Sequence, residues 1–101
     1  MTAEQIITAV SDITGVTIEE MIAPGRLTRR VYARTLAAHA IRTTCAGWSL
    51  QDIGEIFSMK HNNIAHMLTR HRRLATTDHG YMLAVEQLNN LTTNQQTKCK
   101  D

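Results

Sequence analysis

Hydrophobic residues recur at helical spacing along most of the chain. Thr2 and Gln5 have the spacing of a capping box, which marks the start of a helix. Gly15 is placed to end that helix, because glycine readily adopts the left-handed conformation beyond a helix end. The pattern therefore predicts a first helix between Thr2 and Gly15. Its apolar face consists of Ile6, Val10 and Ile13.

Turn signals divide the rest of the chain into further helices. Thr17 and Glu20 have capping-box spacing at the start of a short helix, and Ser49 and Asp52 indicate another N-cap. Good helix formers supply most of the apolar residues, and no long β-branched alternation is present. We therefore expect an all-α fold, a compact bundle of about six helices. The predicted helices after the second are residues 29–44, 50–57, 61–75 and 79–91.

The predicted helix over residues 29–44 separates small apolar residues from basic ones. We expect Arg34 and Arg42 either to contact phosphate groups of a ligand or to pair with acidic residues such as Glu19 or Glu20. The apolar face, where small residues permit close packing, holds Ala33, Leu36, Ala37 and Ala40. The stripe on the opposite side consists of Arg34, Ala38 and Arg42.

The next two predicted helices, residues 50–57 and 61–75, are joined by a short connection, as in a helix-turn-helix. Gly54 lies in the middle of the first of them and costs about 1 kcal/mol relative to alanine, so we expect a close helix crossing there. At about 100° per residue, one arc of the second helix faces the core. That arc consists of Ile64, Met67, Leu68, His71, Leu74 and Ala75.

The outward face of the helix over residues 61–75 is polar and has no acidic residue. Asparagine can read adenine, arginine can read guanine or neutralise phosphate, and the methyl groups of threonine and alanine can contact thymine. In a helix-turn-helix, the second helix enters the major groove while the first crosses the DNA backbone. This face therefore predicts double-stranded DNA as the partner. Its residues are Asn62, His66, Thr69 and Arg73, flanked by Ala65, Asn63 and Arg70.

The distribution of charge also favours a polyanionic partner. Residues 26–73 hold nine basic and two acidic residues, a net charge of +7, whereas the rest of the chain carries −5. The chain has 101 residues, of which 43% are hydrophobic, so it fits one domain with a modest core. This length is too short to add an ATPase or another large catalytic domain.

The residue pattern does not indicate disulfide bonding, secretion, metal binding or catalysis. Cys45 and Cys99 make no disulfide framework, and the N-terminus lacks the features of a signal peptide. His61, His66 and His71 point in different directions on a helix, so they cannot share a metal ion, and we expect His71 to be a hydrogen-bonded core histidine. No carboxylate pair or catalytic triad is present. We therefore expect no enzyme activity, no metal, no cofactor, no small-molecule substrate and no membrane contact.

Two segments of the predicted helix-turn-helix resemble a known family. Residues 50–57 (LQDIGEIF) and 60–66 (KHNNIAH) resemble the C-terminal DNA-binding domain of the bacterial replication initiator DnaA, and the resemblance covers about residues 4–91. The family signature, Gly-Gly-Arg-Asp-His-Thr-Thr-Val, corresponds here to a stretch that is one residue shorter. His61 matches the signature histidine, and Asn62 and Asn63 replace the two threonines.

The resemblance implies a fold and a set of DNA contacts. The fold is a Trp-repressor-like helical bundle, here a DNA-binding domain over residues 1–91 followed by a polar tail at 92–101. The signature positions are expected to read bases in the major groove, and the basic loop at 26–30 to contact phosphate and the minor groove. The expected base contacts are Lys60, His61, Asn62, Asn63, His66 and Thr69. The expected backbone contacts are Arg26, Arg29, Arg30, Arg34, Ser49, Arg70 and Arg73.

The resemblance also implies binding to replication-origin boxes, a location in the cytoplasm at the nucleoid, and other replication proteins as further partners. Because the sequence has no Gly-rich phosphate loop, we expect either a fragment or a stand-alone module that does not itself hydrolyse ATP. As a free module it would mark initiator sites or compete for them. Two alternatives stay open. One is a dimeric helix-turn-helix repressor of transcription, and the other is a domain whose basic face binds an acidic protein.

Overall fold

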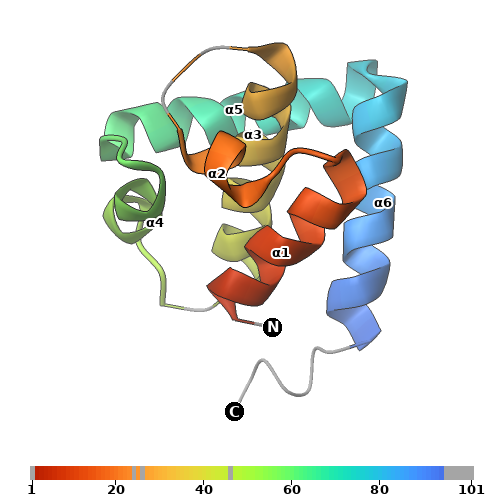
Figure 1. Cartoon of the computed structure of the whole chain (residues 1–101), viewed down its shortest axis with the longest axis horizontal. Helices are drawn as coiled ribbons and strands as arrows, with labels where there is room; N and C mark the ends of the chain where they lie inside the picture. The colour runs from red at the N-terminus through yellow and green to blue at the C-terminus, as the bar shows by residue number, and fades with distance from the viewer. Residues whose placement is uncertain (1, 24, 26, 46, 95–101) are drawn as a thin grey trace.

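The computed structural model describes residues 2–94 apart from residues 24, 26 and 46, which lie outside the described part together with residues 1 and 95–101. The described residues form helices and no strands, so the predicted all-α fold is confirmed (Figure 1). The helices are α1 (Ala3–Thr14), α2 (Ile18–Ile22), α3 (Thr28–Thr44), α4 (Leu50–Phe57), α5 (His61–Thr77) and α6 (His79–Asn94).

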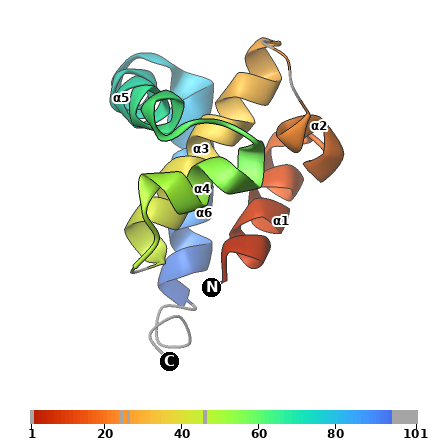
Figure 2. The same ribbon diagram turned by 90° about the vertical axis from the view of Figure 1, so that its left-hand side faces the viewer.

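Helix α3 lies at the centre of the bundle and packs against the other five helices. Figures 1 and 2 show it enclosed by α1 and α2 on one side and by α4, α5 and α6 on the others. A single hydrophobic core results, to which every helix contributes. Among the described residues, no helix is both long and apolar enough to cross a membrane. The largest fully buried side chains include Ile6, Met21, Leu36, Ile41, Ile53, Ile64 and Leu88.

The start and the end of α1 lie where the local sequence signals predict them. The Thr2 hydroxyl accepts the Gln5 backbone N–H at 3.1 Å, and the Gln5 side chain accepts the Thr2 N–H at 2.9 Å. Gly15 ends the helix with a φ of 75°, in the left-handed region. The capping box and the terminal glycine are both confirmed, because each depends only on residues a few positions apart.

Helices α5 and α6 both run further than the pattern predicts. Helix α5 continues to Thr77, and α6 continues to Asn94 instead of ending at Leu91. The Asp78 carboxylate accepts the Tyr81 backbone N–H at 2.9 Å, so it caps the start of α6. Helix α6 thus includes residues 92–94 of the expected polar tail, and the rest of that tail, residues 95–101, lies outside the described part.

Helix α3 is buried on its predicted apolar face and over part of the opposite stripe, where Arg42 stays exposed. Ala33, Leu36, Ala37 and Ala40 are buried as expected. Arg34 and Ala38 are also buried, with exposed fractions of 6% and 0%. The reason is the central position of α3, which has neighbouring helices on both faces. Helical periodicity separates two faces but does not say how many of them are covered.

A buried polar network joins α3, α5 and α6. His71 is 7% exposed, and its Nδ1 lies 2.6 Å from the Tyr81 hydroxyl, which confirms the expected hydrogen-bonded core histidine. Its ring stacks on His39 with a centroid separation of 3.5 Å, a contact that sequence analysis missed. Tyr32 donates its hydroxyl to the Asp78 carboxylate and packs edge-on against Tyr81. These contacts fix α5 on its inward side.

Candidate nucleic-acid interface

The turn between α4 and α5 begins with a regular C-terminal cap of α4. The Ser49 hydroxyl and the Asp52 side chain close a capping box at the start of α4. At its end, Ser58 adopts a left-handed conformation with a φ of 55°. The Met59 N–H donates to the Gly54 carbonyl at 2.8 Å and the Ser58 N–H to the Glu55 carbonyl at 3.4 Å, which is a Schellman motif. This motif sets the angle at which α5 leaves the turn.

Gly54 is required by the turn and not, as sequence analysis expected, by a helix crossing. A Cβ atom at this position would lie 2.3 Å from the carbonyl oxygen of Met59 and 3.6 Å from Cγ1 of Ile64. The Met59 carbonyl is backbone, so it cannot move aside without changing the turn. The missing side chain therefore allows the short connection to fold back over α4 and start α5 close to it.

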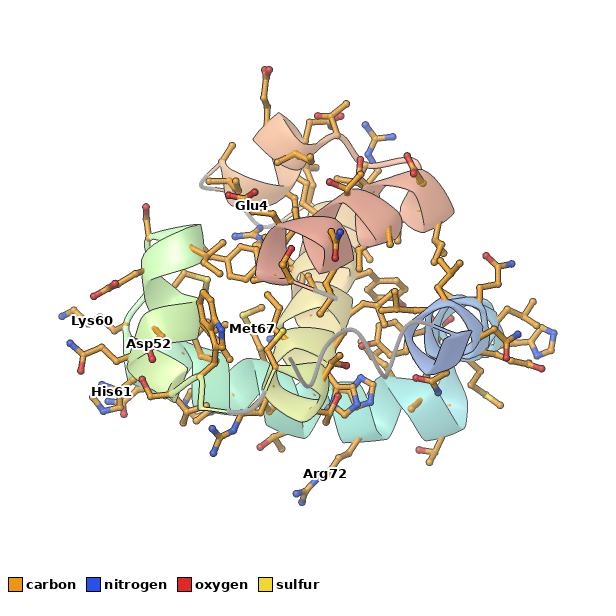
Figure 3. All side chains as sticks on the ribbon, turned by 90° about the horizontal axis from the view of Figure 1, so that it is seen from below. Glu4, Asp52, Lys60, His61, Met67 and Arg72 are labelled. Carbon is orange, nitrogen blue, oxygen red and sulfur yellow. The ribbon has the colours of Figure 1, made fainter. Side chains whose placement is uncertain are left out.

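The inward face of α5 is confirmed residue by residue. Ile64, Met67 and His71 are buried, and Leu68, Leu74 and Ala75 are half-buried. Figure 3 shows Met67 pointing into the bundle, whereas Lys60 and His61 point away from it at the end of α5 next to α4. The orientation of α5 is thus fixed by apolar contacts with α3 and α4.

The outward face of α5 is polar, exposed and free of negative charge. Asn62, His66 and Arg73 are exposed, and no hydrogen bond or ion pair occupies their side chains within the described part of the chain. The Thr69 hydroxyl donates to the Ala65 carbonyl at 3.2 Å, so the hydroxyl is engaged and the methyl group remains for outside contacts. No acidic residue occurs between Lys60 and Thr77. The face therefore offers hydrogen-bonding groups and positive charge to a ligand.

A groove runs between α5 and the α2–α3 region, with a volume of about 880 Å³. The wall formed by α5 carries Asn63, His66, Arg70 and Arg73. The α2–α3 region contributes Gly25, Thr28, Tyr32 and Arg34, and the lining also includes apolar residues. Three guanidinium groups and no carboxylate line this hollow, so its chemistry suits a phosphate backbone lying beside the recognition helix.

The basic residues at the start of α3 are held by internal contacts. Arg26 lies outside the described residues. Nη2 of Arg29 lies 3.0 Å from Oε2 of Glu20, and Nε of Arg30 lies 3.9 Å from the same oxygen. The hydrogen bond from Arg29 keeps the pKa of Glu20 below its usual value. Glu20 thus contacts two of the arginines predicted to bind DNA, whereas the sequence indicated it only as a partner for Arg34 or Arg42.

Arg34 and Arg42 bind backbone carbonyls instead of acidic side chains. Arg34 donates from Nη2 to Gly25 and from Nε to Arg30, the latter at 3.4 Å. Burial, together with the charge of Arg30, lowers the pKa of Arg34. Arg42 donates to the Trp48 carbonyl at 2.6 Å. The expected pairing of these arginines with Glu19 or Glu20 is therefore wrong, because both guanidinium groups support loops.

The predicted contact residues Lys60, His61 and Ser49 are all exposed and lie at the α4–α5 end of the interface. The Ser49 hydroxyl already accepts the Asp52 N–H at 3.1 Å. Figure 3 places Glu4 of α1 across the bundle from α5. The carboxylate of Glu4 is thus kept away from the outward face of α5, and this separation favours an anionic ligand on that face.

The arrangement of α4, the turn and α5 defines a helix-turn-helix domain of the DNA-binding class. A family model of the helix-turn-helix of the bacterial DnaA protein matches residues 3–70, about two thirds of the chain. The chain belongs to this family, which confirms the resemblance seen in the sequence, and membership implies DNA binding. A search of curated proteins finds no match to the chain.

Proposed function

We propose that this domain recognises a specific sequence in double-stranded DNA by placing the outward face of α5 in the major groove. The observation that carries the proposal is the composition of that face, on which exposed Asn62, His66 and Thr69 stand beside Arg73 without an acidic neighbour. Short polar side chains and a threonine methyl group match the pattern of donors, acceptors and methyl groups at base edges.

The groove beside α5 supports the second part of the proposal, which is that one DNA strand lies along it. Arg70 and Arg73 of α5 and Thr28 of α3 all line this hollow. Phosphate contacts there would fix the register of α5 in the major groove, and they carry no sequence information themselves. Arg26, Arg29 and Arg30 would act at the adjacent minor groove, and Ser49 at the backbone on the α4 side.

Family membership suggests the kind of DNA sequence that the domain binds. We propose sites of the initiator type at replication origins, bound by a single copy of the domain without catalysis. Such a module would mark these sites or compete for them, at the nucleoid and next to other replication proteins. A dimeric repressor would instead bind palindromic sites, because its symmetry is matched by the DNA.

The test compares a duplex that carries an initiator-type box with a shuffled copy, by fluorescence anisotropy at two salt concentrations. We expect a preference for the box. The substitution Asn62→Ala should reduce binding to the box by about tenfold or more, because a good base contact contributes roughly 1–3 kcal/mol of discrimination. Asn90→Ala, an exposed change on α6, is the matched control and should have no effect.

Equal binding of the wild-type domain to both duplexes would contradict sequence-specific recognition. A loss of binding in Asn62→Ala that is the same for both duplexes would show that this residue contacts the backbone. Sedimentation with the box duplex checks the stoichiometry, and two copies per box would favour the dimeric repressor.

A further inference from the structure

One carboxylate lies among the arginines at the start of α3. Oε2 of Glu20 is 3.0 Å from Nη2 of Arg29 and 3.9 Å from Nε of Arg30. Thr17 donates its hydroxyl to the other carboxylate oxygen at 3.2 Å, so the Glu20 side chain is held in place from α2. Among the described residues, these are the ion pairs that the structure contains.

The two arginines lie on the α2 side and not in the groove beside α5. The α3 residues that line the groove are Thr28, Val31, Tyr32 and Arg34, and neither Arg29 nor Arg30 is among them. Arg30 packs behind Gly25, where an added Cβ atom would lie 3.4 Å from its Nη1. Two arginines that the sequence predicts as DNA-backbone contacts are therefore turned toward Glu20.

The ion pair between Glu20 and Arg29 can open easily because it lies at the protein surface. The Arg29 side chain is 67% exposed, and exposed ion pairs contribute little to stability because water and salt screen them. A DNA phosphate offers the same guanidinium group a charge-assisted hydrogen bond of equal kind. Glu20 and a phosphate thus compete for the same guanidinium group, and the carboxylate also repels any phosphate that approaches.

We propose that Glu20 is an internal competitor of the DNA backbone, which holds Arg29 in reserve and lowers the affinity of the domain for DNA of any sequence. This inference rests on the proposed DNA-binding function, and it concerns the strength of backbone contacts and not base recognition at α5. Weak backbone binding keeps the domain from being retained on the large excess of non-specific sites, since that binding is almost entirely electrostatic. Glu20 accordingly sets the level of non-specific binding.

The experiment measures binding to the shuffled duplex over a series of salt concentrations for Glu20→Gln and for Glu19→Gln. Both substitutions remove one negative charge from adjacent residues of α2, but Glu19 is exposed and makes no side-chain contact with Arg29 or Arg30. The comparison therefore cancels the general effect of charge. Thermal melting of both variants checks that α2 is intact.

We expect Glu20→Gln to bind the shuffled duplex several-fold more tightly than Glu19→Gln. The slope of log K against log salt should become steeper by about 0.9, the value for one additional phosphate contact. In an Arg29→Ala background, the advantage of Glu20→Gln should disappear, because the competing donor is gone. The ratio of binding to box and shuffled duplexes should stay close to that of the wild type.

Two results would overturn the inference. If Glu20→Gln and Glu19→Gln have the same affinity and slope, the carboxylate does not compete for Arg29. If Glu20→Gln binds more weakly, Glu20 orients Arg29 for contact instead of withholding it. Either result leaves the preference of the wild-type domain for the box unchanged, so failure of this inference is distinct from failure of the proposed function.

Discussion

Two groups of arginines belong to the same basic segment of the sequence, residues 26–73, but they have different environments in the structure. Arg70 and Arg73 of α5 line an open groove and take part in no ion pair within the described part of the chain. Arg29 and Arg34 of α3 are engaged by Glu20 and by the Gly25 carbonyl. A net charge of +7 over residues 26–73 therefore overstates the charge that DNA meets first.

The difference follows from what each helix packs against. One side of α5 covers the core and the other has no protein neighbour, so its arginines point into solvent or into the groove. The start of α3 lies next to α2, which carries Glu20, and beneath the loop that contains Gly25. Whether an arginine is available to bind DNA thus depends on the elements that neighbour its helix and not on the composition of the helix itself.

The largest expected effect concerns Arg34, which we predict to be structural. In Arg34→Met, the Gly25 and Arg30 carbonyls lose a charged donor, so the free energy of unfolding should fall by about 2–4 kcal/mol. Chemical denaturation measures this. Arg72→Met is the control, since Arg72 is exposed and points away from the bundle in Figure 3. Equal losses in the two variants would remove the distinction between engaged and available arginines.

On the inward side of α5, the buried residue His71 should make the stability of the domain sensitive to acid. Burial, together with His39, lowers the pKa of His71 to about 4, whereas an unfolded histidine has a pKa of about 6.5. Between pH 6.5 and 4, His71 therefore binds a proton in the unfolded chain but stays neutral in the folded protein. The contribution of neutral His71 to the free energy of unfolding is fully present above pH 6.5. The free energy of unfolding should fall by about 2–3 kcal/mol as the pH drops toward 4.

Denaturant titrations across this pH range measure the loss of stability. His71→Gln should flatten the pH dependence and leave a smaller slope from His39, whose pKa burial also lowers. His79→Gln, an exposed change on α6, should keep the full dependence. An unchanged slope in His71→Gln would mean that other groups carry the acid sensitivity.

The smallest effect is expected for Arg73, which we predict to act only in binding. Arg73→Ala should weaken binding to box and shuffled duplexes alike by about fivefold and reduce the salt slope by about 0.9, because one phosphate contact is lost. Its thermal stability should stay near that of the wild type. Arg72→Ala changes the adjacent residue, which does not line the groove, and should leave the salt slope unchanged.

Most of the fold could be predicted because its signals are local. The capping boxes of Thr2 and Ser49 involve residues three positions apart, and the inward arc of α5 follows from helical periodicity alone. The outward face of α5 could be predicted in the same way, as the complement of that arc. The position of each predicted contact residue on this face needed no knowledge of the other helices.

The remaining features of the site depend on contacts between distant segments. Glu20 meets Arg29 across the end of α2, and Gly54 is required by the Met59 carbonyl of the turn that follows α4. His39 stacks on His71 although 32 positions separate them. No periodicity relates such pairs, so composition and spacing could not reveal them.

The sequence by itself determined the helices, their amphipathic faces and the helix-turn-helix that places this chain in its family. It did so because helix formation and capping involve residues within a few positions of one another. The tertiary structure alone decided that Arg34 and Ala38 of α3 are buried, and that Arg34 supports a loop while Arg73 stays open to a ligand. Those outcomes depend on which helix lies next to which, and this is set only when the whole core packs.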